Sequence, residues 1–304
     1  MSGVALPDDI SDVLSNNTES DHAKYDQDAS HDDGFSLSTA GLPAEEEKKP
    51  GTGDGDALLQ AEGGDFVVSA SLVSKPTAGA SLTELLKGRN IFLLRHGNTA
   101  KGAAVDADRT LSPKAEHQCA AFLASYGSMI DKVKYVFVSP TKRTISTASF
   151  LGFPDPKCVD YFYYESYFSD DMKALERELG YAPLGSYLDA KEGLGEKLHA
   201  PVREKMADEL ADLLGKELEK ATALGEYEGD ILIVSHAITN STIAQAVLRA
   251  VKAGLGEDAN LSADDICPEE EKIVSFNVGE VEGFAISSQG EVTLLRNEYY
   301  ESSE

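Results

Sequence analysis

Three short runs of apolar residues constrain the fold of this 304-residue chain more than any other feature. They are "NIFLL" at 90–94, "VKYVFVS" at 133–139 and "DILIVS" at 230–235. Each is rich in β-branched and aromatic residues, and none shows the in/out alternation of a strand with one face in water. We therefore expect three parallel strands that are covered on both faces.

Segments with helical signals lie between and beside these runs. Proline follows the expected N-cap of the helix at 112–127 and opens the helix at 140–153. Glycine stands at the expected ends of the helices at 112–127 and 239–256. The last part of the chain, 273–300, predicts closing strands around a Ser-Gln-Gly turn. This alternation predicts an α/β fold: a three-layer domain with a mostly parallel central sheet and helices on both faces. The expected helices span 81–88, 112–127, 140–153, 200–225 and 239–256.

The N-terminal part of the chain has a different composition. Residues 1–75 contain 16 acidic and four basic residues, in polar stretches interrupted by glycine and proline. Such stretches bury too little apolar surface to offset the entropy cost of ordering. We therefore expect an acidic, mostly disordered tail over 1–82 and one catalytic domain over 83–304.

Each predicted strand is followed by residues suited to an anion. Arg95 and His96 follow the first strand, Arg143 lies early in the helix after the second, and His236 follows the third. Ligands of open α/β sheets bind at the carboxyl ends of the strands, so these side chains should meet at one rim. The N-termini of the following helices direct backbone N–H groups to the same place. The sequence thus predicts a phosphate pocket.

In this order, "LLRHGNT", "VSPTKRTISTA" and "ILIVSHA" resemble the motifs of the histidine phosphatase superfamily, which includes phosphoglycerate mutases and bacterial phosphohistidine phosphatases. The resemblance covers roughly residues 88–300. It implies that His96 is the nucleophile that becomes phosphorylated. It also implies that Arg95, Arg143 and His236 hold the phosphoryl oxygens, and we expect Asn98 and Thr99 to bind phosphate as well.

The chemistry of phosphoryl transfer agrees with these roles. A neutral imidazole nitrogen is a competent nucleophile, and fixed cationic donors stabilise the charge that spreads over three equatorial oxygens. The sequence contains no spacing typical of metal ligands, so we expect neither a metal nor a cofactor.

The resemblance further implies a carboxylic acid after the second motif, which protonates the leaving oxygen. The segment "YFYYESYFSDD" offers Glu165, Asp170 and Asp171. The aromatic residues around Glu165 would raise its pKa by desolvation. We favour Glu165, because the resemblance implies an acid that follows a strand at this place. Asp170 and Asp171 remain alternatives.

Two departures narrow the branch of the family. Glycolytic mutases continue the RHG motif with a Trp-Asn pair, whereas this chain continues with "NTAKGAA" and contains no tryptophan. Ala237 follows the second histidine, where phytases and acid phosphatases carry an aspartate. Mutase activity and the phytase branch are therefore both disfavoured.

The net charge of −26 argues against nucleic acid or an anionic membrane as a partner, since phosphate backbones need cationic neutralisation. No apolar run reaches the roughly 18 residues of a membrane helix, and the N-terminus lacks the pattern of a targeting peptide. Three cysteines without motif spacing indicate neither a disulfide framework nor a zinc site. We expect a cytoplasmic protein, with the nucleus as the alternative.

These observations together predict a metal-independent phosphatase that hydrolyses phosphomonoesters through a phosphohistidine. Its partner would be a phosphorylated small molecule or a phosphoprotein. One alternative is a protein phosphohistidine phosphatase, which "DADRTLS" favours because it resembles the small members of the family. The other alternative is a non-catalytic protein that uses the same pocket to bind a phospholigand or to act as a scaffold.

Overall fold

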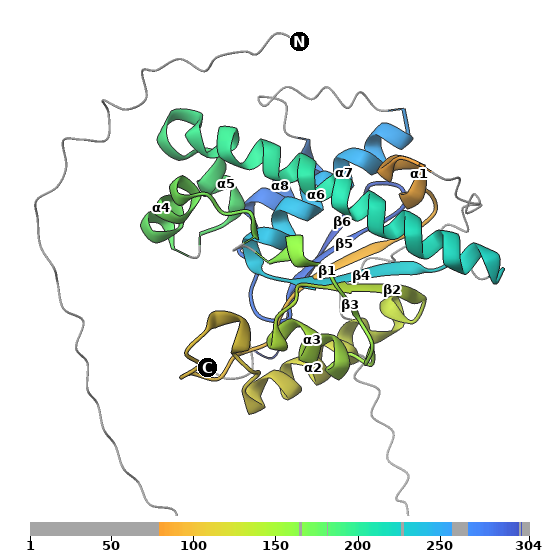
Figure 1. The fold of residues 1–304 in the computed structure, drawn as a ribbon, viewed down its shortest axis with the longest axis horizontal. Helices are drawn as coiled ribbons and strands as arrows, with labels where there is room; N and C mark the ends of the chain where they lie inside the picture. Colours follow the sequence, from red (N-terminus) through yellow and green to blue (C-terminus); the bar gives the residue numbers. More distant parts are fainter. Residues whose placement is uncertain are drawn as a thin grey trace, which may run out of the picture. The chain divides into compact units, whose positions relative to one another are not determined.

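Six strands form one mixed sheet in the order β3-β2-β4-β1-β5-β6 (Figure 1). The computed structural model describes residues 79–163, 166–180, 182–225, 228–256, 267–297 and 299, so nearly all of the expected tail lies outside the described residues. Strands β1 to β4 pair in parallel, and β5 and β6 close the sheet in antiparallel pairing. The strands are β1 Ile91–Arg95, β2 Val133–Val138, β3 Lys157–Cys158, β4 Asp230–Ser235, β5 Gly283–Ile286 and β6 Val292–Leu295.

Helices cover both faces of this sheet, which confirms the predicted three-layer α/β fold. In Figure 1, α2 and α3 lie on one face, and α1, α6 and α7 lie on the other. No helix in the described part of the chain has both the length and the apolar character of a membrane span. The helices are α1 Leu82–Leu86, α2 Pro113–Ile130, α3 Lys142–Phe150, α4 Asp170–Leu179, α5 Leu184–Leu188, α6 Ala190–Ala223, α7 Ala237–Gly254 and α8 Pro268–Ser275; the 3₁₀ turns are η1 Asp106–Asp108 and η2 Asp160–Phe162.

Local signals in the sequence account for where several helices begin. The Ser81 hydroxyl accepts from the backbone N–H of Glu84, and the Glu84 carboxylate accepts from the backbone N–H of Ser81 at 2.8 Å, which is the expected capping box. Helix α2 starts at Pro113 as predicted but continues past Gly127, the expected end. The reason is that Ile130 is buried against the sheet, so the last turn gains apolar burial by staying helical.

The long helix α6 begins earlier than the predicted 200–225. It includes a kink at Lys191, Glu192 and Gly193, whose backbones have positive φ. After the kink, an apolar stripe with one residue at every fourth position packs on the sheet. The stripe consists of Val202, Met206, Leu210, Leu214 and Leu218.

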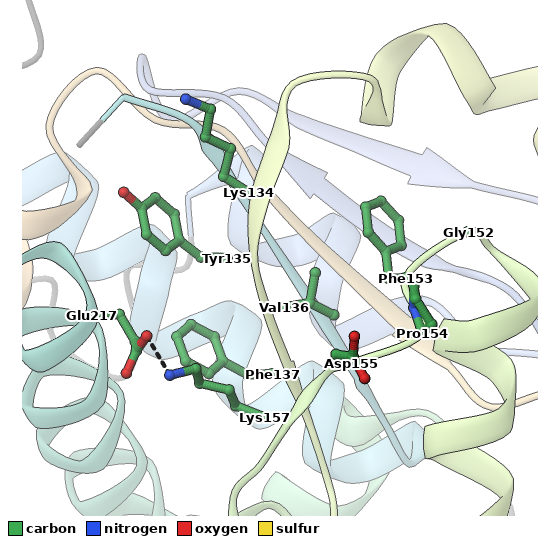
Figure 2. A pocket seen from close by; sticks show the side chains of 10 residues that line it. All are labelled: Lys134, Tyr135, Val136, Phe137, Gly152, Phe153, Pro154, Asp155, Lys157 and Glu217. Carbon is green, nitrogen blue, oxygen red and sulfur yellow. Dashed lines mark ion pairs between the residues drawn. The ribbon is translucent and has the colours of Figure 1, made fainter. Parts of the chain in front are cut away.

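The outer edge of the sheet is β3, which pairs with β2 only through Lys157 and Cys158. Both residues are exposed, so the sequence offered no apolar run from which to predict a strand. Beside this edge lies a cavity of about 240 Å³, and Lys157 forms an ion pair there with Glu217 of α6 (Figure 2). None of the motif residues lines it. The lining residues are Lys134, Tyr135, Val136, Phe137, Gly152, Phe153, Pro154, Asp155, Lys157 and Glu217.

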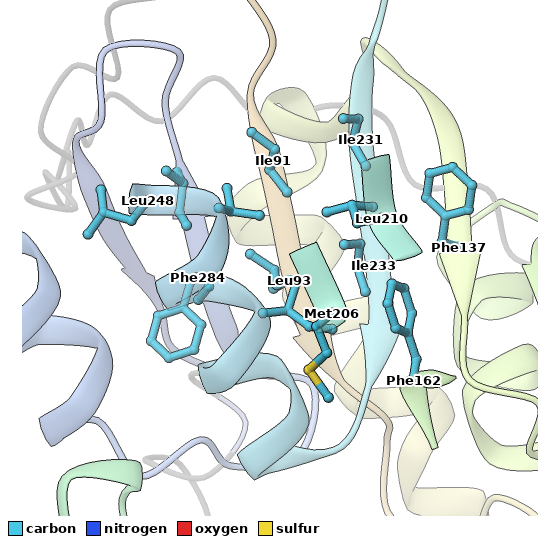
Figure 3. Packing of buried hydrophobic residues seen from close by; sticks show 14 of the residues in the cluster. Ile91, Leu93, Phe137, Phe162, Met206, Leu210, Ile231, Ile233, Leu248 and Phe284 are labelled. Atoms are coloured by element: carbon cyan, nitrogen blue, oxygen red, sulfur yellow. The ribbon is translucent and has the colours of Figure 1, made fainter. Parts of the chain in front are cut away.

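Two large apolar clusters pack on the sheet, one on each face, and a third, smaller cluster of Leu175, Leu184, Tyr187 and Val274 joins α4, α5 and α8. Ile91 and Leu93 of β1 face α6 and α7, where Met206 and Leu210 contribute to the same cluster (Figure 3). The intervening Phe92 and Leu94 face α2 and α3. Burial on both faces explains why the sequence of β1 does not alternate between apolar and polar residues. Each fully buried apolar side chain contributes about 1.5–3 kcal/mol to stability. This packing fixes the strand ends from which the site is built.

Candidate active site

The carboxyl ends of β1, β2 and β4 bring the motif residues together. His96 and His236 follow adjacent strands, and their ring centroids lie 5.3 Å apart. A guanidinium nitrogen of Arg143 lies 3.4 Å from Nδ1 of His236. Arg95 joins these three residues in lining a cavity of about 340 Å³. Residues from three segments that are far apart in the sequence thus meet at the predicted rim.

The tautomer of His96 follows from its contact with the next residue. Nδ1 lies 2.8 Å from the carbonyl oxygen of Gly97. A carbonyl oxygen only accepts, so Nδ1 carries the proton and Nε2 keeps its lone pair. Burial lowers the pKa of His96 to about 3, and the nearby charges of Arg143 and Arg95 act in the same direction. The imidazole is therefore neutral at physiological pH, the form in which it can act as a nucleophile.

Gly97 must be a glycine because helix α2 passes close to its backbone. A Cβ atom at this position would lie 2.8 Å from Cβ of Ala115. The backbone N–H of Gly97 also donates to Oγ1 of Thr147 in α3, at 3.0 Å. The turn that carries His96 is thus held between the two helices on that face of the sheet.

His236 is fixed by contacts on both ring nitrogens. Nε2 lies 2.9 Å from the Ser139 hydroxyl, and Nδ1 faces Arg143. Burial lowers the pKa of His236 well below its ordinary value, and the proximity of His96 and Arg143 lowers it further. Both imidazoles in the cavity are therefore neutral, and the fixed positive charge comes from arginine.

Arg143 is almost completely buried and is already paired with an anion. One guanidinium nitrogen lies 2.6 Å from the Asp106 carboxylate, and the other donates to the Asp106 carbonyl oxygen. Tyr163 donates to the same carboxylate at 3.0 Å, and Arg109 lies 3.4 Å from it. Burial alone would raise the pKa of Asp106, but these donors, Arg143 above all, hold it below its usual value. Asp106 is therefore an ionised carboxylate surrounded by donors that suit a phosphoryl group.

The two polar residues that follow the RHG motif have different surroundings. Thr99 lines the cavity and accepts a hydrogen bond from Arg109. Asn98 donates to Glu280 at 2.8 Å and accepts from Ser112 at 2.6 Å, and it is not among the residues that line the cavity. In this arrangement Asn98 holds the loop after the RHG motif through Glu280 and Ser112, whereas Thr99 lies at the cavity wall.

The candidate acids are also placed differently from one another. Glu165 lies outside the described residues. Asp170 and Asp171 are exposed in the first turn of α4 and do not line the cavity. Glu176, two turns further along α4, does line it, and sequence reasoning missed this residue. Burial raises the pKa of Glu176, and the charge of Asp106 raises it further.

Other side chains complete the wall of the cavity. Phe168, Tyr187 and Ile238 add apolar surface beyond the histidines and arginines. Within the described ranges, no group of three or more His, Cys, Asp and Glu side chains has the arrangement of a metal site. The cavity therefore combines a cationic inner end with an aromatic and aliphatic wall.

Residues 91–158 match the histidine phosphatase superfamily (branch 1). Among solved structures, the chain is similar to the protein histidine phosphatase SixA complexed with tungstate, with 14% identity over 67% of this chain and 93% of that chain and a TM-score of 0.33. It is similar to phosphoglycerate mutase from Bacillus anthracis, with 13% identity, coverage of 68% and 91%, and a TM-score of 0.36.

A third similar structure is a mycobacterial glucosyl-3-phosphoglycerate phosphatase, with 17% identity, coverage of 69% and 98%, and a TM-score of 0.43. No curated protein sequence matches the chain. The family match covers β1, the RHG motif and the second motif, and ends at β3. It agrees with the resemblance of the motifs: the model of the histidine phosphatase superfamily, branch 1, matches residues 91–158.

Proposed function

We propose that this protein is a metal-independent phosphatase that hydrolyses phosphomonoesters through a phosphohistidine on His96. The observation that carries the proposal is a neutral His96 with its lone pair on Nε2, in one cavity with Arg143 and His236. The family match over 91–158 supports it. Arg95 lines the same cavity and supports the proposal with a further guanidinium.

The first step forms a bond between Nε2 of His96 and phosphorus while the bond from phosphorus to the ester oxygen breaks. The electron pair of the broken bond goes to the leaving oxygen, which takes a proton from a carboxylic acid. Arg95, Arg143 and His236 bind the three remaining phosphoryl oxygens, where the negative charge spreads in the transition state. Arg143 must release Asp106 for this, because the two are paired in the unliganded site.

The second step transfers the phosphoryl group to water. A water molecule attacks phosphorus, gives its proton to the carboxylate that was left by the first step, and breaks the bond to His96. The electron pair returns to Nε2 and inorganic phosphate leaves. Because His96 is neutral at the start and at the end, the cycle needs no external base.

The size of the cavity favours a phosphorylated small molecule over a phosphoprotein. Its volume of about 340 Å³ lies in the range of small-ligand sites. Phe168, Tyr187 and Ile238 line the same cavity and supply apolar surface for the alcohol part of such an ester. We propose a small phosphate ester with a partly apolar alcohol as the substrate class.

A substrate panel tests this function. Purified protein is incubated with an alkyl phosphate, an aryl phosphate, a phosphoramidate and a phosphohistidine peptide, each with and without a chelator. We expect phosphate release from both esters, unchanged by the chelator and absent in His96→Ala. Turnover of the phosphohistidine peptide alone would favour the protein phosphohistidine phosphatase. Binding of phosphate without any turnover would favour the non-catalytic alternative.

A further inference from the structure

Three carboxylates line the cavity that holds His96. Asp106 belongs to η1, Glu176 belongs to α4, and Glu280 precedes β5. A phosphomonoesterase needs one carboxyl that is protonated when the ester bond breaks and that has no competing partner at that moment. The contacts of the three carboxylates distinguish them.

Two of the three carboxylates are already engaged. Asp106 accepts from Arg143 at 2.6 Å and from Tyr163 at 3.0 Å, and these donors favour its ionised form. Glu280 accepts from Asn98 at 2.8 Å and from Gln118 at 2.9 Å. Neither carboxylate is placed to hold a proton and pass it to a ligand.

Glu176 differs from both. Its side chain is half-buried, and no hydrogen bond or ion pair joins it to any of the described residues. Burial raises its pKa, with a further contribution from the negative charge of Asp106. A carboxyl of this kind keeps its proton closer to neutral pH than an exposed glutamate does. Glu176 lines the same cavity as Asp106 and Arg143.

The helix that carries Glu176 is anchored on both sides of it. Met172 and Leu175 are buried, and the Ser169 hydroxyl caps the helix by accepting from the backbone N–H of Met172. At the other end, the Tyr187 hydroxyl donates to the carbonyl oxygen of Gly180. Tyr187 itself lines the cavity. Glu176 is therefore held in the cavity by a rigid element, as a catalytic group requires.

We infer that Glu176 is the general acid of this enzyme, in place of Glu165, which the sequence favours. This inference rests on the proposed function. The Glu176 carboxyl gives its proton to the ester oxygen as the phosphorus–oxygen bond breaks, so that a neutral alcohol leaves. The resulting carboxylate then takes a proton from the water that attacks the phosphohistidine, which restores the acid for the next cycle.

The experiment compares leaving groups in matched variants. Glu176→Gln keeps the size of the side chain but cannot donate a proton as an acid. Glu178→Gln is the control on the same helix, because Glu178 is exposed and pairs with Lys191 at 3.0 Å. Glu165→Gln tests the rival acid. Each variant is assayed on an alkyl phosphate, whose alkoxide needs a proton, and on 4-nitrophenyl phosphate, whose leaving group does not.

We expect Glu176→Gln to lose roughly 10²- to 10⁴-fold in kcat/KM on the alkyl ester, the usual contribution of a general acid, and less than about tenfold on the aryl ester. The wild-type profile for the alkyl ester should fall at high pH as Glu176 loses its proton, and this limb should be missing in Glu176→Gln. Glu178→Gln should match the wild type in both respects.

Equal activity of Glu176→Gln and wild type on the alkyl ester would overturn the inference, as would equal losses on both esters. A selective loss in Glu165→Gln alone would assign the acid to Glu165 instead. These outcomes differ from a failure of the proposed function, in which the wild type releases phosphate from neither ester or does so without His96.

Discussion

The carboxylate of Asp106 lies 2.6 Å from the guanidinium of Arg143, and both residues line the cavity that holds His96. The Tyr163 hydroxyl donates to the same carboxylate, so a guanidinium and a phenol share one anion. A phosphate dianion offers more charge and more acceptor oxygens than a carboxylate, so a substrate can displace it. Under the proposed function, a substrate therefore has to displace the Asp106 carboxylate from Arg143.

Removing this internal anion should strengthen phosphate binding. In Asp106→Ala, Arg143 has no carboxylate to release, so we expect the inhibition constant of inorganic phosphate to fall about tenfold, equivalent to about 1.4 kcal/mol. Asp108→Ala is the control, since the Asp108 carboxylate pairs with the exposed Lys142 at 2.8 Å. Competition assays with phosphate against an aryl ester provide the measurement. Unchanged or weaker inhibition in Asp106→Ala would show that Asp106 does not compete for the site.

Loss of the Arg143 side chain should damage turnover far more than folding. We expect kcat/KM of Arg143→Ala to fall by about 10²- to 10³-fold, because a charged donor in such a site contributes roughly 2.7–4 kcal/mol to the transition state. Arg143→Lys should recover only part of the lost kcat/KM, since lysine lacks the planar pair of N–H donors of a guanidinium. Lys142→Ala, at the exposed neighbouring position, serves as the control. Turnover of Arg143→Ala near the wild-type level would mean that Arg143 does not hold the phosphoryl group.

The buried His96 should make the protein less stable in mild acid. Its pKa is about 3 in the folded state, against an ordinary value of about 6.5 in the unfolded chain. Between these values the unfolded state binds a proton that the folded state does not. Stability contributed by neutral His96 is therefore complete above about pH 6.5 and decreases as the pH falls. His96→Gln should gain in Tm relative to the wild type between pH 8 and pH 5, as measured by thermal unfolding. A Tm difference that is the same at both pH values would contradict this.

The two glycines at positions 97 and 127 should respond in opposite directions to alanine. Gly97→Ala forces a Cβ to 2.8 Å from Ala115 and should cost about 1–3 kcal/mol, with loss of activity because His96 shifts. Gly127 lies inside α2 with open space around it, so Gly127→Ala should stabilise the protein by about 0.5–1 kcal/mol. Denaturant unfolding of both variants gives the two values. A neutral Gly97→Ala would mean that α2 can move away from the turn.

The central strands of the fold could be predicted because each is a short apolar run that is visible in the sequence itself. Four consecutive apolar residues in β1 predict a strand that is covered on both faces. Arg95 and His96 follow them at the carboxyl end of this strand. Strand β3 and the short helix α5 could not be found in this way. Lys157 and Cys158 are exposed, and α5 is five residues long, so neither element shows an apolar periodicity of its own.

The cavity residues contributed by loops and by α4 were harder to predict. Asp106 lies in the "DADRTLS" segment, but its role depends on η1 folding back onto Arg143, a contact over 37 positions of the chain. Glu176 was not predicted because it lies outside the aromatic segment at 161–171, which contains Glu165, Asp170 and Asp171. Its helix did carry signals: Ser169 as the cap, two acidic residues in the first turn and Gly180 at the end. Helical periodicity from Met172 to Leu175 then places Glu176 beside the buried face.

The central claim is that phosphate passes through His96, and acid–base lability of the enzyme-bound label tests it most directly. The protein is mixed with a ³²P-labelled ester, quenched within the turnover time and digested, and the labelled peptide is identified. The account predicts label on the peptide containing His96, stable in alkali and lost in acid as a phosphoramidate is, and no label in His96→Ala. Label that survives acid, or that persists in His96→Ala while esters are still hydrolysed, would contradict it.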